Sequence, residues 1–150
     1  GGDDVAQYYA RLNKQLSGGA LKKQLHSIIR NHDVLDYRTV WDALENMDEG
    51  QGGCGGSQVK DIYSGKCWTT KSKRCGQGET DKVGLCYNRE HTWPQSWWGG
   101  VDAGSPATTD IVHLFLADGY VNKKRSNLPL GRVAETHFTS PNGAKVGTCA

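Results

Sequence analysis

The chain has 150 residues, enough for one domain with a hydrophobic core, and its 20 glycines and 23% charged residues favour a globular protein rich in loops. No apolar run reaches the roughly 18 residues that a membrane-spanning helix needs, which excludes a transmembrane helix. The net charge of +2 is uneven: residues 51–150 hold twelve basic and eight acidic side chains, which weakly favours a polyanionic partner.

The first 50 residues show the spacing of amphipathic helices. Apolar side chains in residues 3–47 recur every three or four positions, and this predicts three short helices. Gly18 and Gly19 separate the first two helices, and Asp36 or Thr39 can cap the third. We interpret residues 1–50 as a helical scaffold that takes no part in chemistry.

The middle of the chain changes to strand-length patterns. The segments "VKDIYSGKCW" (59–68) and "KVGLCYNRE" (82–90) predict two strands of one sheet, with a polar loop at 69–82 between them. A Gly-rich passage at 97–109 follows, and residues 109–127 turn periodic again. Asp118 there can cap a helix that runs through Tyr120 and Arg125.

The cysteines bear on the compartment. They show no CxxC pair, and their irregular gaps do not resemble a structural zinc site. Disulfide bonds are therefore expected, which favours an oxidising compartment, although a reduced protein with scattered cysteines remains an alternative. The pairing stays open and one cysteine is left over from the set Cys54, Cys67, Cys75, Cys86 and Cys149.

The stretch "LCYNREHTWPQSWW" (85–98) places groups suited to phosphodiester cleavage side by side. His91 can remove a proton from water near neutral pH, and Pro94 stiffens the loop that aims it. Glu90 offers a hard oxygen ligand for Mg²⁺. Neighbours on a strand point to opposite faces, so both serve one site only if the strand ends or bends there.

A second stretch, "DGYVNKKRSN" (118–127), offers complementary groups. Asn122 and Arg125 are three residues apart, so they share a face of the predicted helix. An amide oxygen can bind a hard metal ion, and a guanidinium can bind phosphate through paired donors.

Together, "NREHTWPQSWW" and "TDIVHLFLADGYVNKKRSNLPLG" closely resemble the bacterial endonuclease I family, periplasmic or secreted nucleases of the ββα-metal (His-Me finger) class. The resemblance runs from Tyr8 or Tyr9, through "LDYRTVWDAL", to about Val133. It implies that His91 is the general base, that Glu90 and Asn122 bind Mg²⁺, with Mn²⁺ or Ca²⁺ as alternatives, and that Arg125 stabilises the phosphate.

The resemblance also implies a fold. We expect an α+β protein in which N-terminal helices accompany a small antiparallel sheet and a helix, forming a disulfide-stapled ββα-metal core. Residues 1–150 would be a single nuclease domain, with the core at 57–130. Two departures stand out: Leu116 replaces a usual Pro, and Val112 replaces a usual His. The family's C-terminal helices are not in this sequence, so a truncated, split or unusually short member is expected.

Several further residues have two interpretations. Arg89 either steers phosphate or forms a salt bridge, whereas His113 is expected to support the loop structurally, as are the cysteines. Lys123 and Lys124 are expected to contact substrate phosphates rather than form only a solvated helix face. Three tryptophans could stack on exposed bases, but core packing is the expected role of Trp93, Trp97 and Trp98.

The sequence therefore predicts a secreted or periplasmic, metal-dependent and sequence-nonspecific endonuclease. Water activated by His91 would cleave DNA and RNA to 5′-phosphate products, in a monomer without membrane contacts; alternatively, another chain supplies a missing C-terminal segment. One alternative function is a secreted, disulfide-stapled binding module for carbohydrate or single strands. A hydrolase with Cys86 or Ser96 as nucleophile is weaker, because neither lies in a GxSxG elbow.

Overall fold

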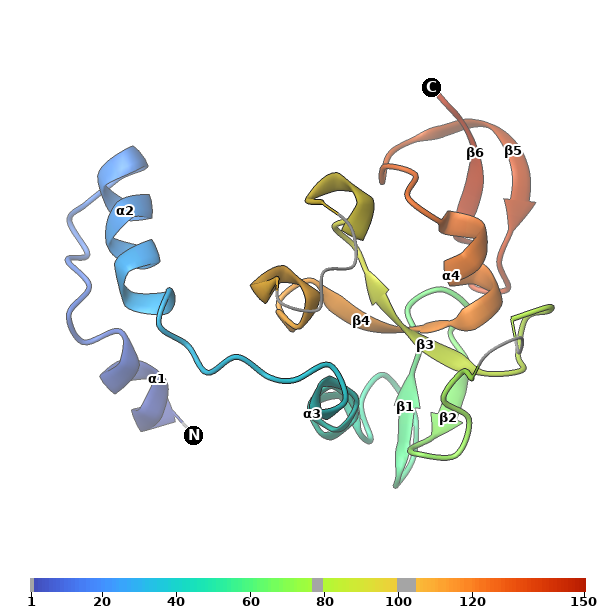
Figure 1. Ribbon diagram of the computed structural model, residues 1–150, viewed down its shortest axis with the longest axis horizontal. Coiled ribbons are helices and arrows are strands. Elements are labelled where there is room, and N and C mark those ends of the chain that lie inside the picture. The colour runs from blue at the N-terminus through green and yellow to red at the C-terminus, as the bar shows by residue number, and fades with distance from the viewer. Residues whose placement is uncertain (1, 77–79, 100–104) are drawn as a thin grey trace. The chain divides into compact units, whose positions relative to one another are not determined.

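The computed structural model describes residues 2–76, 80–99 and 105–150 (Figure 1). Parts of the predicted loops, at 77–79 and 100–104, lie outside the described residues. The chain divides into two compact units, Gly1–Val34 and Leu35–Ala150. None of the described helices has the length and apolar character needed to cross a membrane.

The first unit holds two helices, α1 (Gly2–Tyr8) and α2 (Gly18–Ile29), as predicted. The segment between them is tied to α2 through Gln24, whose side chain accepts from the Asn13 backbone N–H at 2.8 Å and donates to the Arg11 carbonyl at 3.2 Å. No residue of α2 is fully buried, and its apolar stripe, including Leu21, is only half-buried.

The second unit begins with α3 (Thr39–Asp48), the third predicted helix. The Asp36 carboxylate accepts from the backbone N–H groups of Arg38 and Thr39, both at 2.9 Å, so Asp36 stabilises the start of this helix, although the N-cap position itself is Arg38. α3 buries Glu45, which accepts from Arg74 Nε at 2.8 Å and from the Tyr87 hydroxyl at 2.6 Å. These bonds fasten α3 to the strand that carries Tyr87.

The predicted strand at 59–68 is wrong. It is instead a short hairpin of β1 (Gln58–Lys60) and β2 (Cys67–Thr69), which pair with each other. The buried Asp61 organises the turn: it accepts from the backbone N–H groups of Tyr63 at 3.0 Å and Ser64 at 2.6 Å, and from Trp68 Nε1 at 2.8 Å. A carboxylate that collects this many donors favours the turn over a continuous strand.

The next strand, β3 (Tyr87–His91), pairs antiparallel with β4 (Leu114–Asp118), a segment for which the sequence specified no strand. Two short 3₁₀ turns, η1 (Gln95–Trp97) and η2 (Pro106–Thr108), lie in the connection. Helix α4 (Gly119–Arg125) follows β4 at once and contacts both strands. The Asp118 carboxylate accepts from the Tyr120 and Val121 N–H groups at 3.0 and 3.1 Å, so the predicted cap is confirmed.

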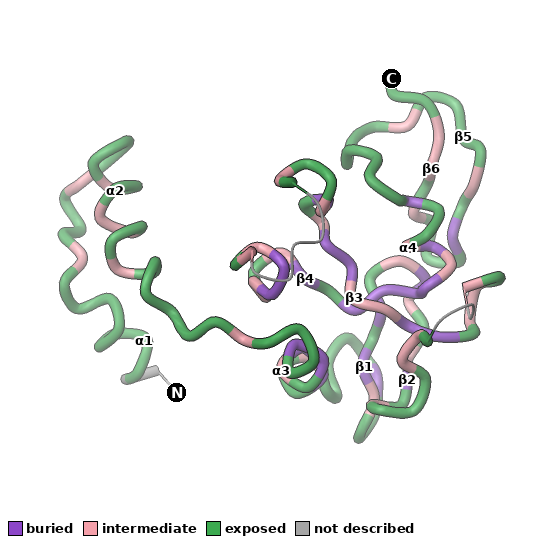
Figure 2. The backbone as a smooth tube through the Cα atoms, viewed as in Figure 1, coloured by how far each residue is buried: buried purple, intermediate pink, exposed green. Residues whose placement is uncertain are grey.

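A hydrophobic core lies between α3, the β1–β2 hairpin and the β3–β4 pair. Buried residues are concentrated on β3, β4 and the inner side of α3 (Figure 2). The core cluster consists of Val40, Trp41, Leu44, Val59, Trp68, Tyr87, Leu114 and Leu116. The ends of β3 and β4 are therefore anchored, which holds any side chain at those ends in a fixed place.

The last two strands, β5 (Val133–Thr139) and β6 (Lys145–Cys149), form a separate antiparallel hairpin that the sequence patterns above do not predict. Its turn docks on the β1–β2 turn, because the buried Ser140 hydroxyl donates to the Tyr63 carbonyl at 2.6 Å. Phe138 also packs edge-on against Tyr120 of α4, with ring centroids 5.8 Å apart.

Two disulfides staple the second unit. Cys54 is bonded to Cys67 and Cys75 to Cys86, whereas Cys149 is free and exposed. Each disulfide closes a short loop, which is worth about 3 kcal/mol in the chain-entropy model. The expected α+β fold with small antiparallel sheets and disulfide bonds is confirmed.

Candidate active site

Three segments converge where β3 ends. Glu90 and His91 are the last two residues of β3, both buried, and α4 runs against this strand. The antiparallel register sets Glu90 opposite Phe115 and His91 opposite Leu114. β3 ends at His91, which meets the condition under which adjacent residues can serve one site.

The Glu90 carboxylate is held by two donors. With 2% of its surface exposed, its Oε1 accepts from the Tyr63 hydroxyl and from Arg125, each at 2.6 Å. Burial raises the pKa of Glu90, and the bonds from Tyr63 and Arg125 oppose that rise by favouring the carboxylate. The carboxylate Oε2 makes no hydrogen bond with any residue of the described segments, so it is available to another partner.

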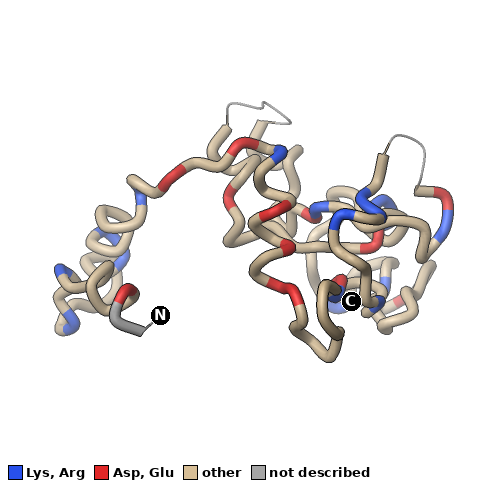
Figure 3. Tube along the Cα trace, turned by 90° about the horizontal axis from the view of Figure 1, so that it is seen from below, with Lys and Arg blue, Asp and Glu red and all other residues tan. Residues whose placement is uncertain are grey.

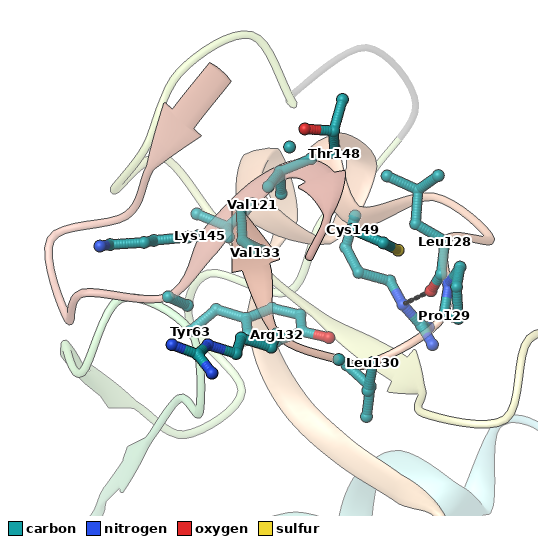
Figure 4. A pocket seen from close by; sticks show the side chains of 15 residues that line it. Tyr63, Val121, Leu128, Pro129, Leu130, Arg132, Val133, Lys145, Thr148 and Cys149 are labelled. Atoms are coloured by element: carbon teal, nitrogen blue, oxygen red, sulfur yellow. Dashed lines mark hydrogen bonds between the residues drawn. The ribbon is translucent and has the colours of Figure 1, made fainter. Parts of the chain in front are cut away.

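Arg125 ties α4 to the end of β3. Its guanidinium donates to the carbonyls of His91 at 2.7 Å, Thr92 at 2.6 Å and Leu128 at 3.1 Å, in addition to Glu90. Arg125 and Leu128 also line a pocket together with residues of β5 and β6, and Figure 4 marks the bond to the Leu128 carbonyl with a dashed line. Four of its five N–H groups are thus used within the described protein, and its side chain is almost fully buried. In this arrangement Arg125 sets the position and charge of Glu90. One N–H group of Arg125 remains free of these bonds and could make the predicted contact with phosphate.

Burial and one backbone carbonyl define the state of His91. Its Nε2 lies 3.0 Å from the Thr108 carbonyl oxygen, which can only accept, so Nε2 carries the proton and Nδ1 keeps its lone pair. A longer contact of 3.4 Å to the Gln95 amide does not compete with this bond. Burial lowers the pKa of His91, His113 and Arg89 lower it further, and the Thr108 carbonyl opposes them. His91 is therefore a neutral imidazole at neutral pH.

Asn122 lies one helix turn before Arg125 and is half-buried. Its Nδ2 donates weakly to the Arg89 carbonyl on β3, at 3.4 Å. That bond orients the amide against the strand and leaves Oδ1 without a hydrogen bond to any residue that the structure describes. Both predicted metal ligands thus keep one oxygen uncommitted.

These two oxygens suit a hard divalent ion. A carboxylate Oε2 and an amide Oδ1 are the ligand types that Mg²⁺ takes, and Mg²⁺ retains waters at its other positions. Within residues 2–76, 80–99 and 105–150, no group of three or more His, Cys, Asp and Glu side chains is placed to hold a metal. The donor set therefore fits a cation bound by few protein ligands and does not fit a closed zinc site.

Arg89 contacts aromatic rings. Its guanidinium carbon lies 3.5 Å from the ring centroid of Tyr37 and 4.5 Å from that of Trp41, and its NH1 donates to the Tyr37 carbonyl. Its buried Nε has no hydrogen-bond partner among the described residues. Burial lowers the pKa of this guanidinium. No carboxylate within the described segments forms a salt bridge with Arg89.

The remaining predicted residues are distributed as follows. Lys123 and Lys124 are exposed on α4, while basic and acidic residues are interspersed along the chain (Figure 3). His113 Nε2 lies 2.8 Å from the Ala107 carbonyl, and its ring is 5.6 Å from that of His91. Cys86 is disulfide-bonded, which removes it as a nucleophile. The expected core packing is wrong for Trp93 and Trp97, which are 50% and 52% exposed.

Two contacts of the site were not foreseen. Tyr63 reaches Glu90 from the β1–β2 turn, and the Thr108 carbonyl reaches His91 from η2. Nothing in the sequence marks a backbone carbonyl as an imidazole partner. A buried tyrosine hydroxyl normally needs a hydrogen-bond partner, but that rule identifies no particular one.

Comparison with known proteins identifies the family. The family model described as Endonuclease I matches residues 17–150, which is most of the chain. This chain belongs to the endonuclease I family. The family match includes Glu90, His91, Asn122 and Arg125, and it excludes α1.

Curated relatives support the assignment. The chain is 38% identical over 125 residues to a protein named extracellular ribonuclease from Bacillus amyloliquefaciens, covering 83% of this chain and 39% of that protein. It is 35% identical over 138 residues to an extracellular ribonuclease from Bacillus subtilis (strain 168), covering 92% and 44%. The chain thus spans about two fifths of the length of these relatives. No solved structure matches it significantly.

Proposed function

We propose that this protein is a metal-dependent, sequence-nonspecific endonuclease that hydrolyses phosphodiester bonds in DNA and RNA. The observation that carries the proposal is the neutral imidazole of His91, next to a carboxylate held by Tyr63 and Arg125. Its Nε2 donates to the Thr108 carbonyl, and its Nδ1 makes no hydrogen bond with any described residue. Family membership and relatives named ribonucleases support nucleic acid as substrate.

We propose that residues 57–130 form the ββα-metal core of a nuclease domain. Within it, β3, β4 and α4 are the two antiparallel strands and the helix that give the core its name. In it, Nδ1 of His91 takes a proton from water, and the Thr108 carbonyl steadies the imidazolium through Nε2–H. Water rather than a ribose hydroxyl attacks phosphorus, so both DNA and RNA are substrates and the products carry 5′ phosphates.

Glu90 Oε2 and Asn122 Oδ1 would hold the divalent ion, Mg²⁺ by preference. When bound, the ion supplies positive charge beside the phosphate and its 3′ leaving oxygen. Arg125 keeps Glu90 ionised and in place, and exposed Lys123 and Lys124 attract the nucleic acid backbone. Secretion is proposed from the two disulfides and from the extracellular names of the relatives.

A cleavage assay tests the function. Supercoiled plasmid and a mixed-sequence RNA are incubated with the protein and Mg²⁺, with or without chelator. We expect degradation of both that stops with chelator and with His91→Ala, whereas His137→Ala, which changes an exposed histidine of β5, keeps full activity. Binding of nucleic acid without cleavage under every condition would instead identify a binding module. Cleavage that continues in the presence of chelator would exclude metal dependence.

The metal ligands need their own test. Asn122→Ala and Glu90→Gln are each expected to raise the Mg²⁺ concentration at half-maximal rate, because each removes or weakens one oxygen donor. Lys123→Ala is the control from the same helix, since it weakens substrate binding without changing Mg²⁺ dependence. An unchanged Mg²⁺ dependence in Asn122→Ala would show that this amide is not a ligand.

A further inference from the structure

Aromatic rings surround the imidazole of His91. The Tyr37 ring is stacked with it at 6.4 Å and an interplanar angle of 24°, and the Trp98 ring lies 6.2 Å away. Trp93 extends the group, because its ring is 6.3 Å from Trp98 and 6.1 Å from His113. All of these residues belong to the unit Leu35–Ala150. We call Tyr37 and Trp93 the aromatic flank of the site.

The aromatic flank faces solvent rather than the core. Trp93 is 50% exposed and Tyr37 37% exposed, although His91 between them is only 7% exposed. Other aromatic residues of this unit, such as Trp41 and Trp68, are buried. Large rings that stay partly exposed beside a proposed catalytic base offer apolar surface for a ligand to cover.

Both rings are held in place before any ligand arrives. Arg89 lies against Tyr37 at 3.5 Å, donates to its carbonyl, and also lies 4.5 Å from the buried Trp41. The Trp98 indole N–H donates to the Trp93 carbonyl at 3.3 Å, which fixes the backbone that carries Trp93. A Tyr37 ring held by Arg89 and a Trp93 backbone held by Trp98 have less entropy to lose on binding, which favours stacking.

In the proposed reaction, the planar groups that reach the aromatic flank are the nucleobases of the substrate. A phosphate attacked by the water that His91 activates brings its two flanking nucleotides against the surrounding surface. In a duplex those bases are paired and stacked inside the helix, but in an unpaired strand they can turn outward onto aromatic side chains. Exposed Lys123 and Lys124 complement the backbone of the same strand.

We propose that Tyr37 and Trp93 stack on unpaired bases flanking the scissile phosphate, which makes single-stranded nucleic acid the preferred substrate. This inference rests on the proposed nuclease function and adds a substrate class to it. Because every base offers a π face, the preference is for unpaired strands and not for a sequence. Arg89 then acts as a positioning residue that holds Tyr37.

The test compares cleavage of one phosphodiester linkage with and without bases on its flanking sugars. An end-labelled single-stranded oligonucleotide carries either thymines or abasic sugars on both sides of a chosen phosphate, and the cleavage rate there is read from product length. For the unmodified protein with Mg²⁺, base removal is expected to lower kcat/KM about 5- to 150-fold, the range of base–aromatic stacking. Annealing the thymine strand to its complement should lower it similarly.

The variants decide whether the rings cause this difference. Trp93→Ala and Tyr37→Leu are each expected to lower kcat/KM on the thymine linkage at least severalfold and to leave the abasic linkage unchanged. Trp93→Phe should retain most of the base effect, because it keeps an aromatic face. Trp97→Ala is the matched control, since Trp97 is equally exposed but makes no ring contact with a described aromatic residue.

The outcomes separate the two proposals. If the protein cuts but Trp93→Ala and Tyr37→Leu lose equal activity on thymine and abasic linkages, the stacking inference is wrong and the nuclease function stands. The stacking inference is also wrong if unmodified protein cuts both linkages, and duplex and single strands, at equal rates. If unmodified protein with Mg²⁺ cuts nothing, the proposed function falls and takes the stacking inference with it.

Discussion

Replacing Arg125 with Met should destabilise the protein far more than a single surface charge would. Arg125 is 5% exposed and pairs with Glu90, which is 2% exposed, at 2.6 Å. Removing one partner of a buried pair leaves the other charge uncompensated, at a cost of about 3–5 kcal/mol in the free energy of unfolding. Three backbone carbonyls also lose their donor, so the upper half of that range is expected.

The loss in free energy of unfolding caused by Arg125→Met should increase with pH. Burial already raises the pKa of Glu90, and without Arg125 that pKa rises further. Between the unfolded value near 4.5 and the raised folded value, the native state binds the proton and the unfolded chain does not. Stability therefore falls as the pH rises through this window, and Arg125→Met should be hurt most at neutral and alkaline pH.

Urea unfolding, followed by fluorescence in the presence of chelator at several pH values, measures these free energies. Lys123→Met, an exposed change on the same helix, should stay within about 0.5 kcal/mol of the unmodified protein. The double variant Glu90→Gln, Arg125→Met should recover at least about 1 kcal/mol relative to Arg125→Met, since no buried charge remains. A cost below about 1 kcal/mol for Arg125→Met, with no recovery in the double variant, would refute this reasoning.

Three more predictions follow from the same geometry. Gly119→Ala should cost about 1–3 kcal/mol, measured by urea unfolding, because a Cβ there would clash with Cys75 Sγ and lie 3.1 Å from Cys86 Sγ; unchanged stability would contradict that packing. NMR titration of metal-free protein should give His91 a pKa below 6.5, so this proposed base stays neutral as pH falls toward that value; a pKa above 6.5 would contradict its burial. Tyr63→Phe should cost about 1.5–3 kcal/mol by losing the bond to Glu90, and a thermal unfolding shift near zero would argue against that bond.

Local sequence signals predicted the elements that depend on local chemistry. Asp118 caps α4 as expected, and Asp36 accepts from the first N–H groups of α3, since such bonds need only a carboxylate two or three residues before the N–H groups. The hairpin at 58–69 was missed because Asp61 and Ser64 act as a turn inside an otherwise strand-like composition. The alternating pattern of β5 and the Asn142-Gly143 pair at its turn were also available signals.

The site divides in the same way. Glu90, His91, Asn122 and Arg125 were predicted from two short motifs, and the structure brings their segments together on β3 and α4. Their actual partners could not be predicted, because the Tyr63 hydroxyl and the Thr108 carbonyl arrive from distant loops. Burial of the tryptophans was also misjudged, since composition gives the average preference of a residue type and not the direction in which a loop points it.

The contact between Ser140 and the Tyr63 carbonyl connects the β5–β6 turn to Glu90, the proposed metal ligand, through Tyr63. The Tyr63 hydroxyl donates to Glu90, and the Tyr63 carbonyl in turn accepts from the Ser140 hydroxyl of the β5–β6 hairpin. A ligand, antibody or inserted peptide that displaces residues 140–143 would therefore be expected to shift Tyr63 and, through it, Glu90. For protein engineers, that hairpin is a position at which to attach a reporter group or an inhibitory domain.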